Sequence, residues 1–358
     1  MEASPVEHGI SFLPDCRPAR RSAEEYFRDV LTLSSLADQA GLSHVKMTEH
    51  YLHPYGGYCP NPLTFLAAVA ARTRRIRLMT GCLLPAFHHP VQLAAETAMV
   101  DALSGGRLDV GFARAYLPYE FETFGVRMDE SRARYEATIK AVLRLWTEQG
   151  VSERTPFFSY QDATSLPRPV QPPHPPVWGA AVRSRQSFAW LGEQGFGLLV
   201  TPTLSSLAEM RDHIEVYREA FEDNHGSTGR SPRVAASLPL YVGATEVEAA
   251  RTGDALLGEY LEVWAEATDS WRSTRSADYQ GYTGMATAIR GLDVRALRES
   301  GGAVVGSVER VVDRVSEVRA ELTADCFLWQ VDFGGVTGQV AETSLRRFID
   351  EVLPALAG

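Results

Sequence analysis

The segment Met47-Thr48-Glu49-His50-Tyr51-Leu52-His53-Pro54 ends a short apolar run that begins at His44. A run of this length, followed by polar residues and proline, is typical of a buried β-strand that passes into a loop. Loops that follow parallel strands are where α/β folds hold their functional groups. Glu49 and His50 are therefore either a catalytic pair or an exposed strand end. The rest of the sequence is needed to distinguish these two interpretations.

Similar apolar runs recur along the chain. We expect strands at residues 8–13, 44–48, 76–84, 107–113, 176–181, 196–201, 234–242 and 326–333. Helical spacing of apolar residues appears between them, at 27–37, 91–102, 207–221, 308–322 and 345–356. This alternation predicts a parallel sheet, and eight units close most economically into a (β/α)8 TIM barrel. We expect residues 1–358 to form one such domain.

Two long insertions interrupt the repeat. Residues 114–175, after the fourth expected strand, contain one helical pattern and end in a proline-rich stretch that we expect to be an extended connector. Residues 253–302, after the seventh, carry Trp264, Trp271, Tyr279 and Tyr282. The second insertion is either a lid over an active site or a helical excursion packed on the side of the barrel.

Composition narrows the class of protein. The chain has 358 residues, of which 45% are hydrophobic, and a formal charge of -10 without a basic stripe, which disfavours nucleic acid and anionic membranes as partners. The first residues carry no basic start or apolar signal core, and no apolar run is long enough to cross a bilayer. We expect a soluble cytoplasmic protein. The four cysteines lie far apart, which predicts reduced thiols without disulfides or structural zinc.

Common nucleotide and metal motifs are missing. Gly301-Gly302-Ala-Val-Val-Gly306-Ser307 lacks the lysine of a P-loop and is better explained as a loop and N-cap before the next helix. No G-x-G-x-x-G follows a strand. His50 and His53 have the spacing of half a metalloprotease motif, but Glu49 precedes them on a strand. Asp332 is the best remaining support for a metal-dependent hydrolase. We expect no metal.

Polar residues at four strand ends suggest a different site. Glu49-His50, Thr80-Gly81-Cys82, Arg114, and Arg183-Ser184 with Ser187 all follow expected strands, and a barrel brings these points to one rim. A helix N-terminus with hydroxyls and arginines suits a phosphate. A glycine at position 81 would let a flat ring approach the backbone closely. The sequence predicts a site for a phosphate and an aromatic plane together.

Several segments resemble the bacterial luciferase-like monooxygenases, flavin-dependent (β/α)8 enzymes. These are Thr48-Glu49-His50, Thr64-Phe65-Leu66-Ala67-Ala68, Pro85-Ala86-Phe87-His88-His89-Pro90, and above all Asp101-Ala102-Leu103-Ser104-Gly105-Gly106-Arg107-Leu108-Asp109-Val110-Gly111 followed by Phe124-Gly125-Val126-Arg127-Met128-Asp129-Glu130-Ser131-Arg132. The resemblance covers essentially the whole chain and is clearest over residues 40–146 and 184–191.

The resemblance implies roles for individual residues. It places Glu49, Thr80 and Gly81 at the isoalloxazine ring, with a non-proline cis peptide in the last stretch. It makes His50 the catalytic histidine that supports the oxygenated flavin and moves protons. The FMN phosphate would be held by Arg114, Arg183, Ser184 and Ser187, although the role of Arg183 is inferred, because luciferase has an acidic residue there.

The resemblance also implies an activity and partners. We expect a two-component monooxygenase that uses reduced FMN and O2 to insert one oxygen atom into an apolar organic substrate of specialised metabolism. A separate NAD(P)H:flavin reductase would supply the reduced FMN, and helices on the barrel side would form a homodimer. Tyr51 and Ala113 replace a histidine and a reactive cysteine of light-emitting luciferases, which weighs against light emission. The alternatives are a deazaflavin-dependent hydride transferase of the same superfamily and a non-catalytic partner subunit.

Overall fold

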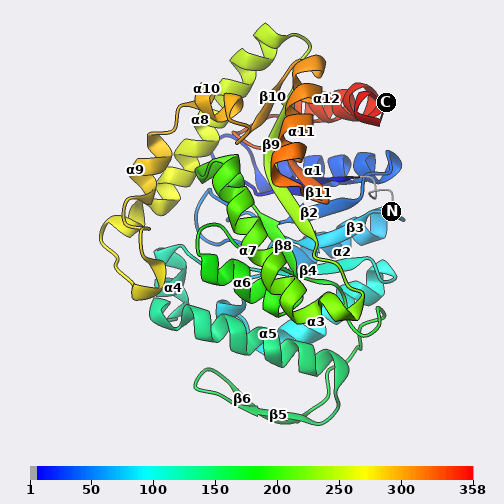
Figure 1. Cartoon of the computed structure of the whole chain (residues 1–358), viewed down its shortest axis with the longest axis vertical. Coiled ribbons are helices and arrows are strands. Elements are labelled where there is room, and N and C mark those ends of the chain that lie inside the picture. Colours follow the sequence, from blue (N-terminus) through cyan, green and yellow to red (C-terminus); the bar gives the residue numbers. More distant parts are fainter. Residues whose placement is uncertain (1–5, 358) are drawn as a thin grey trace.

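The eight expected strands form one closed parallel sheet (Figure 1). The computed structural model describes residues 6–357. The barrel strands are β1 (Glu7–Phe12), β2 (His44–Met47), β3 (Arg77–Thr80), β4 (Leu108–Phe112), β7 (Val177–Ala180), β8 (Gly197–Val200), β9 (Val234–Val242) and β11 (Cys326–Asp332). They follow one another in chain order, and the pairings of β8 with β9 and of β11 with β1 close the ring. The expected (β/α)8 barrel is confirmed.

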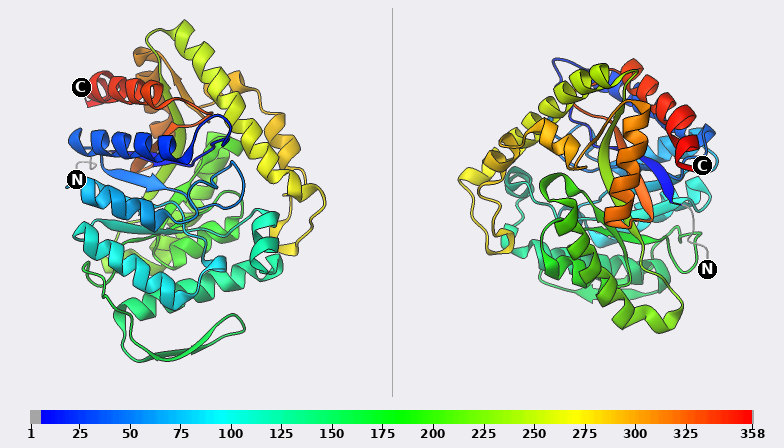
Figure 2. Two further views of the ribbon diagram at one scale, coloured as in Figure 1. Left: turned by 180° about the vertical axis from the view of Figure 1, so that it is seen from behind. Right: turned by 45° about the horizontal axis from the view of Figure 1, so that its top comes forward.

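Helices surround the strands, as Figure 2 shows. They are α1 (Ala23–Gln39), α2 (Pro62–Arg72), α3 (Pro90–Ser104), α5 (Ser131–Thr147), α6 (Arg185–Glu193), α7 (Leu207–His225), α8 (Glu246–Thr268), α11 (Val308–Leu322), α12 (Gly338–Arg347) and α13 (Leu353–Ala357). Local sequence sets their starts: Ser22 and Ser206 form capping boxes with Glu25 and Glu209 at the N-termini of α1 and α7. No helix within the described residues is long and apolar enough to cross a membrane.

Sequence patterns did not predict two short strand features. A hairpin of β5 (Val151–Arg154) and β6 (Ser159–Ala163) projects from the first insertion, and β10 (Val304–Gly306) pairs with β9 outside the barrel. The hairpin strands are mostly polar and exposed, so they carry no apolar alternation to detect. Ser307, directly after β10, caps α11 by accepting a hydrogen bond from the Arg310 amide, so the expected N-cap is confirmed.

The two insertions meet at one end of the barrel. Residues 114–175 contain α4 (Pro118–Phe124), α5 and the hairpin, and residues 253–302 contain the end of α8, α9 (Met285–Arg290) and α10 (Val294–Glu299). Figure 1 shows the loop between α8 and α9 beside α4, and the two segments are in contact. Because α4 directly follows β4, this is the end where the barrel strands terminate.

The segment that most resembles the luciferase-like family is structural. Asp101 is fully buried, and its carboxylate accepts hydrogen bonds from the Val170 amide and from the amide and side chain of Gln171. Arg107 donates five hydrogen bonds to residues 70–76 and to Ser104. These contacts attach the proline-rich connector to α3 and the end of α2 to β4, so they hold successive barrel units together.

Candidate active site

One cavity of about 570 Å³ opens where the barrel strands end. That volume is in the range of pockets that hold cofactor-sized molecules. Seven of the eight residues expected at the site line this cavity: Glu49, His50, Gly81, Arg114, Arg183, Ser184 and Ser187. Their assembly follows from topology, because the segments after β2, β3, β4 and β7 meet at one rim.

Thr80 is the exception, and the structure does not bring it to the cavity. Its side chain is fully buried, donates a hydrogen bond to the Gly111 carbonyl at 2.9 Å and accepts one from the Gly111 amide at 2.8 Å. The Thr80 hydroxyl therefore joins β3 to β4. The non-proline cis bond that the resemblance implied in the stretch Thr80-Gly81 is present one peptide later, between Gly81 and Cys82.

Gly81 has a different neighbour from the one expected. A Cβ atom at this position would lie 2.2 Å from both Cγ and Cδ of Lys46. The missing side chain thus makes room for the lysine stem, which crosses this part of the cavity wall. The approach of a flat ring to Gly81 stays a prediction beside this role.

Glu49 is fully buried, and its carboxylate holds neighbouring segments together through hydrogen bonds. Its carboxylate accepts hydrogen bonds from the Tyr51 hydroxyl at 2.6 Å and the Leu84 amide at 3.0 Å, and its Oε1 lies 2.8 Å from Nε2 of His88. Burial lowers the pKa of His88, but the hydrogen bond and charge of Glu49 outweigh it, so the pKa lies above the usual value. Glu49 therefore fixes the loops after β2 and β3 against each other.

His50 is oriented by a residue that sequence patterns did not indicate. Nδ1 of His50 lies 3.0 Å from Oε1 of Glu120, and the same oxygen accepts the Tyr51 amide at 2.9 Å. Glu120 lies on α4, is fully buried, and its Oε2 has no partner among the described residues. The remaining nitrogen, Nε2, is left for the cavity that His50 lines. Seventy residues separate the two side chains, so no spacing rule could connect them.

A cationic region forms the side of the cavity at α6. Ser184 is the N-cap residue of α6 but makes no side-chain cap, and Arg132 donates to Ser187 Oγ at 3.4 Å. Arg114 donates to Ser131 Oγ at 2.8 Å, pairs with Asp278 at 3.2 Å, and its Nε is buried without a partner among the described residues. Free helix amides and an unpaired guanidinium N–H suit an anion, so these residues fit the phosphate of a flavin.

Aromatic side chains form another part of the wall of this cavity. Tyr55 and Trp264 stack with their ring planes 5° apart, and Trp264 donates to the Tyr116 hydroxyl at 3.0 Å. Tyr260, Tyr282 and Met285 also line the cavity, whereas Asp278 and Tyr279, which line it too, contact Arg114 of the cationic region. Most of these residues belong to 253–302, so this insertion contributes directly to the cavity wall.

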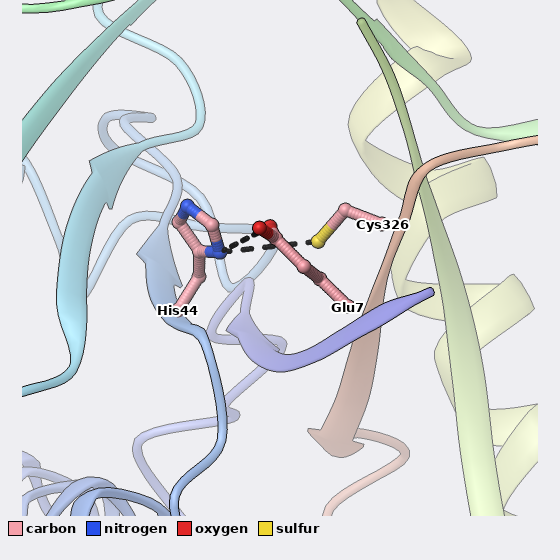
Figure 3. Close-up of side chains that lie close together, drawn as sticks. All are labelled: Glu7, His44 and Cys326. Carbon is pink, nitrogen blue, oxygen red and sulfur yellow. Dashed lines mark hydrogen bonds and ion pairs between the residues drawn. The ribbon is translucent and has the colours of Figure 1, made fainter. Parts of the chain in front are cut away.

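A second polar cluster lies at the opposite end of the barrel, at the starts of β1, β2 and β11. Figure 3 shows Glu7 and Cys326 close to His44, with Nδ1 3.8 Å from Glu7 Oε2 and 3.9 Å from Cys326 Sγ. His44 also contacts Ser43 Oγ at 2.9 Å and Asp109 at 3.1 Å, and Glu7 pairs with Arg233 at 3.3 Å. Because both ring nitrogens already have protein partners, we assign the cluster to closing this end of the barrel.

Asp332, the carboxylate that best supported a hydrolase, is an ion-pair residue. Both of its oxygens accept from Nη1 of Arg21, at 3.0 and 2.9 Å. Asp15 is buried nearby and accepts the Gly334 amide, and its other oxygen has no partner among the described residues. Burial raises the pKa of Asp15 to about 7, against the effect of the Gly334 hydrogen bond, and raises that of Asp332 to about 6.

The Asp15 carboxyl predicts a pH-dependent stability. Its folded pKa of about 7 exceeds the ordinary 3.8, so its stabilising contribution is fully present below the lower value and lost as the pH rises through the higher one. The Asp15→Asn variant should gain stability relative to the unmodified protein by at most about 1.4 kcal/mol per pH unit across this window. Urea unfolding at several pH values measures it. Asp223→Asn, at an exposed position, is the control. The prediction would be contradicted if the free energy of unfolding of Asp15→Asn changed with pH in parallel with that of the unmodified protein.

The cavity at the strand ends combines a helix N-terminus, arginines, aromatic side chains and a buried histidine, an arrangement suited to a cofactor. The chain belongs to the luciferase-like monooxygenase family, whose model matches residues 7–326. The family and fold expected from the sequence are both confirmed. Proteins similar to this chain include a flavin-dependent monooxygenase and an F420-dependent dehydrogenase.

Named relatives agree with this assignment. The oxygenase component of the flavin-dependent trigonelline monooxygenase of Acinetobacter baylyi is 27% identical over 94% of this chain and 92% of its own length. Monooxygenase RslO1 from Streptomyces bottropensis is 35% identical, covers 98% of this chain and 99% of its own, and superposes with a TM-score of 0.83.

More distant structures share the fold. The oxygenating constituent of 3,6-diketocamphane monooxygenase from Pseudomonas putida, solved with FMN, has a TM-score of 0.81 at 19% identity over 98% of both chains. The coenzyme F420-dependent tetrahydromethanopterin reductase of Methanopyrus kandleri has a TM-score of 0.70 at 17% identity, over 99% of this chain and 100% of its own. The same fold thus occurs in one enzyme solved with FMN and in another that depends on coenzyme F420.

Proposed function

We propose that the protein is the oxygenase component of a two-component monooxygenase that uses reduced FMN and O2 to insert one oxygen atom into an apolar organic substrate. A separate NAD(P)H:flavin reductase supplies the reduced FMN. The observation that carries the proposal is the division of one cavity into a cationic end at α6 and an aromatic chamber against His50. The naming of a relative as an oxygenase component supports it.

Each part of the cavity has a task in this proposal. The amides at the start of α6, with Ser184, Ser187, Arg114 and Arg183, hold the phosphate. Bound reduced flavin supplies the electrons that activate O2. Nε2 of His50 holds or moves a proton at the reacting oxygen, and Glu120 keeps the ring in position. Residues 253–302 act as a lid whose aromatic side chains exclude water from the reaction.

The aromatic chamber indicates the class of substrate. Stacked Tyr55 and Trp264, with Tyr116, Tyr260 and Met285, offer flat apolar faces and few charges. A planar, polycyclic or aromatic molecule of specialised metabolism fits this lining. Screening such compounds for oxygenation with reduced FMN tests the choice. A preference for short aliphatic acids would contradict it.

The phosphate assignment predicts a selective loss of affinity. Arg114→Met should weaken FMN binding by about tenfold to a hundredfold, the equivalent of one lost hydrogen bond from a charged group, and leave riboflavin binding unchanged. Riboflavin lacks the phosphate, so the pair of ligands isolates this contact. Calorimetry with both ligands measures it. Arg185→Met, on an exposed residue outside the cavity lining, is the matched control. An equal loss for riboflavin would mean that Arg114 only supports the fold.

The second candidate function is F420-dependent hydride transfer, which the fold shared with the Methanopyrus kandleri enzyme favours. Anaerobic binding of FMN and F420, followed by mixing with O2 in a stopped-flow spectrometer, separates the two functions. The monooxygenase proposal expects tight binding of reduced FMN and its oxidation by O2 while bound. Tight binding of F420, without binding of FMN, would replace it.

We also propose that the protein is a homodimer associated through helices on the barrel side. Met99 and Leu103 of α3 are 49% and 61% exposed, and large apolar side chains in adjacent turns of a surface helix commonly mark an interface. Sedimentation analysis should find a dimer, and Leu103→Glu should shift it towards monomer. A stable monomer of the unmodified protein would refute the proposal.

A further inference from the structure

Lysine is almost absent from this chain, which carries its positive charge on arginine. Of the 35 basic residues only Lys46 and Lys140 are lysines. Lys140 is exposed on α5, whereas Lys46 lies on β2, is 8% exposed and lines the cavity. A buried lysine is costly to the fold unless something pairs with its charge. Its place in the cavity therefore calls for an explanation.

The ammonium of Lys46 has no anionic partner within residues 6–357. Its one hydrogen bond goes to the Gly81 carbonyl at a long 3.4 Å, and that oxygen already accepts the Thr48 hydroxyl at 2.7 Å. Burial lowers the pKa of Lys46 to about 8. The neighbouring Cys82 acts in the opposite direction only when its thiol is ionised, and burial raises the pKa of that thiol to about 12. Two of its three N–H donors are left for a ligand.

Gln330 supplies a second hydrogen-bond donor without a partner among the described residues, and it lies in the same row of side chains across the strands as Lys46. Ser11 on β1 is the register partner of Lys46 on β2 and of Gln330 on β11, so the three side chains lie at one level on the floor of the cavity. Nε2 of Gln330 is buried without a hydrogen-bond partner among the described residues. An ammonium and an amide N–H on either side of Ser11 suit an acceptor-rich, negatively charged edge of a ligand.

This row lies across the barrel from the proposed phosphate site. The row belongs to β2, β1 and β11, whereas the cationic region follows β4 and β7, so β3 lies between the two groups on one side of the ring and β8 and β9 lie between them on the other. A ligand with a phosphate at one end and a delocalised anion at the other would satisfy both. Reduced flavin is such a ligand, because its ring system carries a negative charge shared between N1 and the C2 oxygen when ionised.

We propose that Lys46, assisted by Gln330, binds the anionic edge of the reduced flavin ring and so favours the reduced over the oxidised cofactor. The inference rests on the proposed use of FMN. An anionic substrate, such as a phenolate, offers the same chemistry, and the experiment distinguishes it. Gly81 supports the arrangement because any larger residue there would collide with the Lys46 stem.

The scarcity of lysine makes a direct test possible. Protein grown with lysine labelled with 13C at the ε carbon gives two NMR signals, and Lys140→Arg leaves only that of Lys46. Its titration is followed in the free protein, with oxidised FMN, with reduced FMN under anaerobic conditions, and with 4-nitrophenolate alone. The expected result is a rise in the pKa of Lys46 with reduced FMN only.

Binding measurements give a second readout. Lys46→Met, which keeps the length of the stem, should weaken binding of reduced FMN about tenfold or more relative to oxidised FMN, because one buried charge pair is lost. For a two-electron couple, a tenfold change in this ratio lowers the potential of the bound flavin by about 30 mV. Lys140→Met is the control and should change neither value.

The outcomes separate the two proposals. If FMN in neither redox state binds the unmodified protein, the proposed function fails. If FMN binds but the Lys46 signal does not respond to reduction, and Lys46→Met keeps the ratio of affinities, the inference is overturned and the function stands. A response to 4-nitrophenolate alone would overturn the flavin assignment in favour of an anionic substrate. The NMR experiment decides even if Lys46→Met does not fold.

Discussion

Glu120→Gln should form product about a hundredfold more slowly than the unmodified protein while it binds FMN with unchanged affinity. Oε1 of Glu120 bridges Nδ1 of His50 and the Tyr51 amide, and an amide oxygen can keep both contacts. The substitution replaces the carboxylate beside the imidazole with a neutral amide, whose NH2 group takes the place of the Oε2 that has no partner among the described residues. General acid-base catalysis contributes about 10² to 10⁴ in rate, so losing most of it gives this magnitude.

The measurement is product formation by the reconstituted two-component system, with any substrate that the unmodified protein oxygenates. A positioning role for Glu120 predicts a fall in kcat with little change in KM. It also predicts that Glu120→Gln adds nothing to the loss caused by His50→Ala, because both changes disable one unit. Glu122→Gln, on an exposed residue of the same helix, should behave like the unmodified protein. Equal activity of Glu120→Gln would show that His50 acts without it.

Arg107→Met should lower the free energy of unfolding by about 3 to 5 kcal/mol. Five hydrogen bonds from this guanidinium end on Ser104, on the Thr73 hydroxyl and on the carbonyls of Ala70, Thr73 and Ile76. Losing the charged donor leaves several partly buried carbonyls at the end of α2 unpaired, and each such loss costs about 1 to 3 kcal/mol before the structure relaxes.

Urea unfolding followed by circular dichroism measures this effect. Arg72→Met, also at the end of α2 but exposed and without a hydrogen bond of this kind, is the matched control and should stay within about 0.5 kcal/mol. A loss at Arg107 no larger than that at Arg72 would show that the network can be replaced by water. The comparison tests whether the segment most typical of the family acts through stability alone.

Much of the fold was predictable from local pattern. All eight barrel strands were located because each is a short apolar run bounded by polar residues, and strands buried on both faces carry that composition. The polar hairpin at residues 151–163 and the three-residue β10 lack such a pattern and were missed. The patterns also indicated that Ser184 would stand at the start of a helix, and it is the N-cap residue of α6.

Most of the cavity lining was also predictable, because a barrel brings the ends of its strands to one rim. Glu49, His50, Gly81, Arg114 and Ser184 stand directly after strands, so topology alone brings them together. Thr80 stands one residue earlier, within β3, where side chains alternate in direction, and its hydroxyl bonds the backbone of β4 instead.

By itself, the sequence determined the barrel, its family and the strand-end residues of the cavity, because these depend on periodicity and on order along the chain. Only the tertiary structure decided that Glu120 orients His50, that Asp278 pairs with Arg114, and that Lys46 lies unpaired on the cavity floor. These contacts join residues from different barrel units. Their partners are selected by packing in three dimensions, which no local pattern encodes.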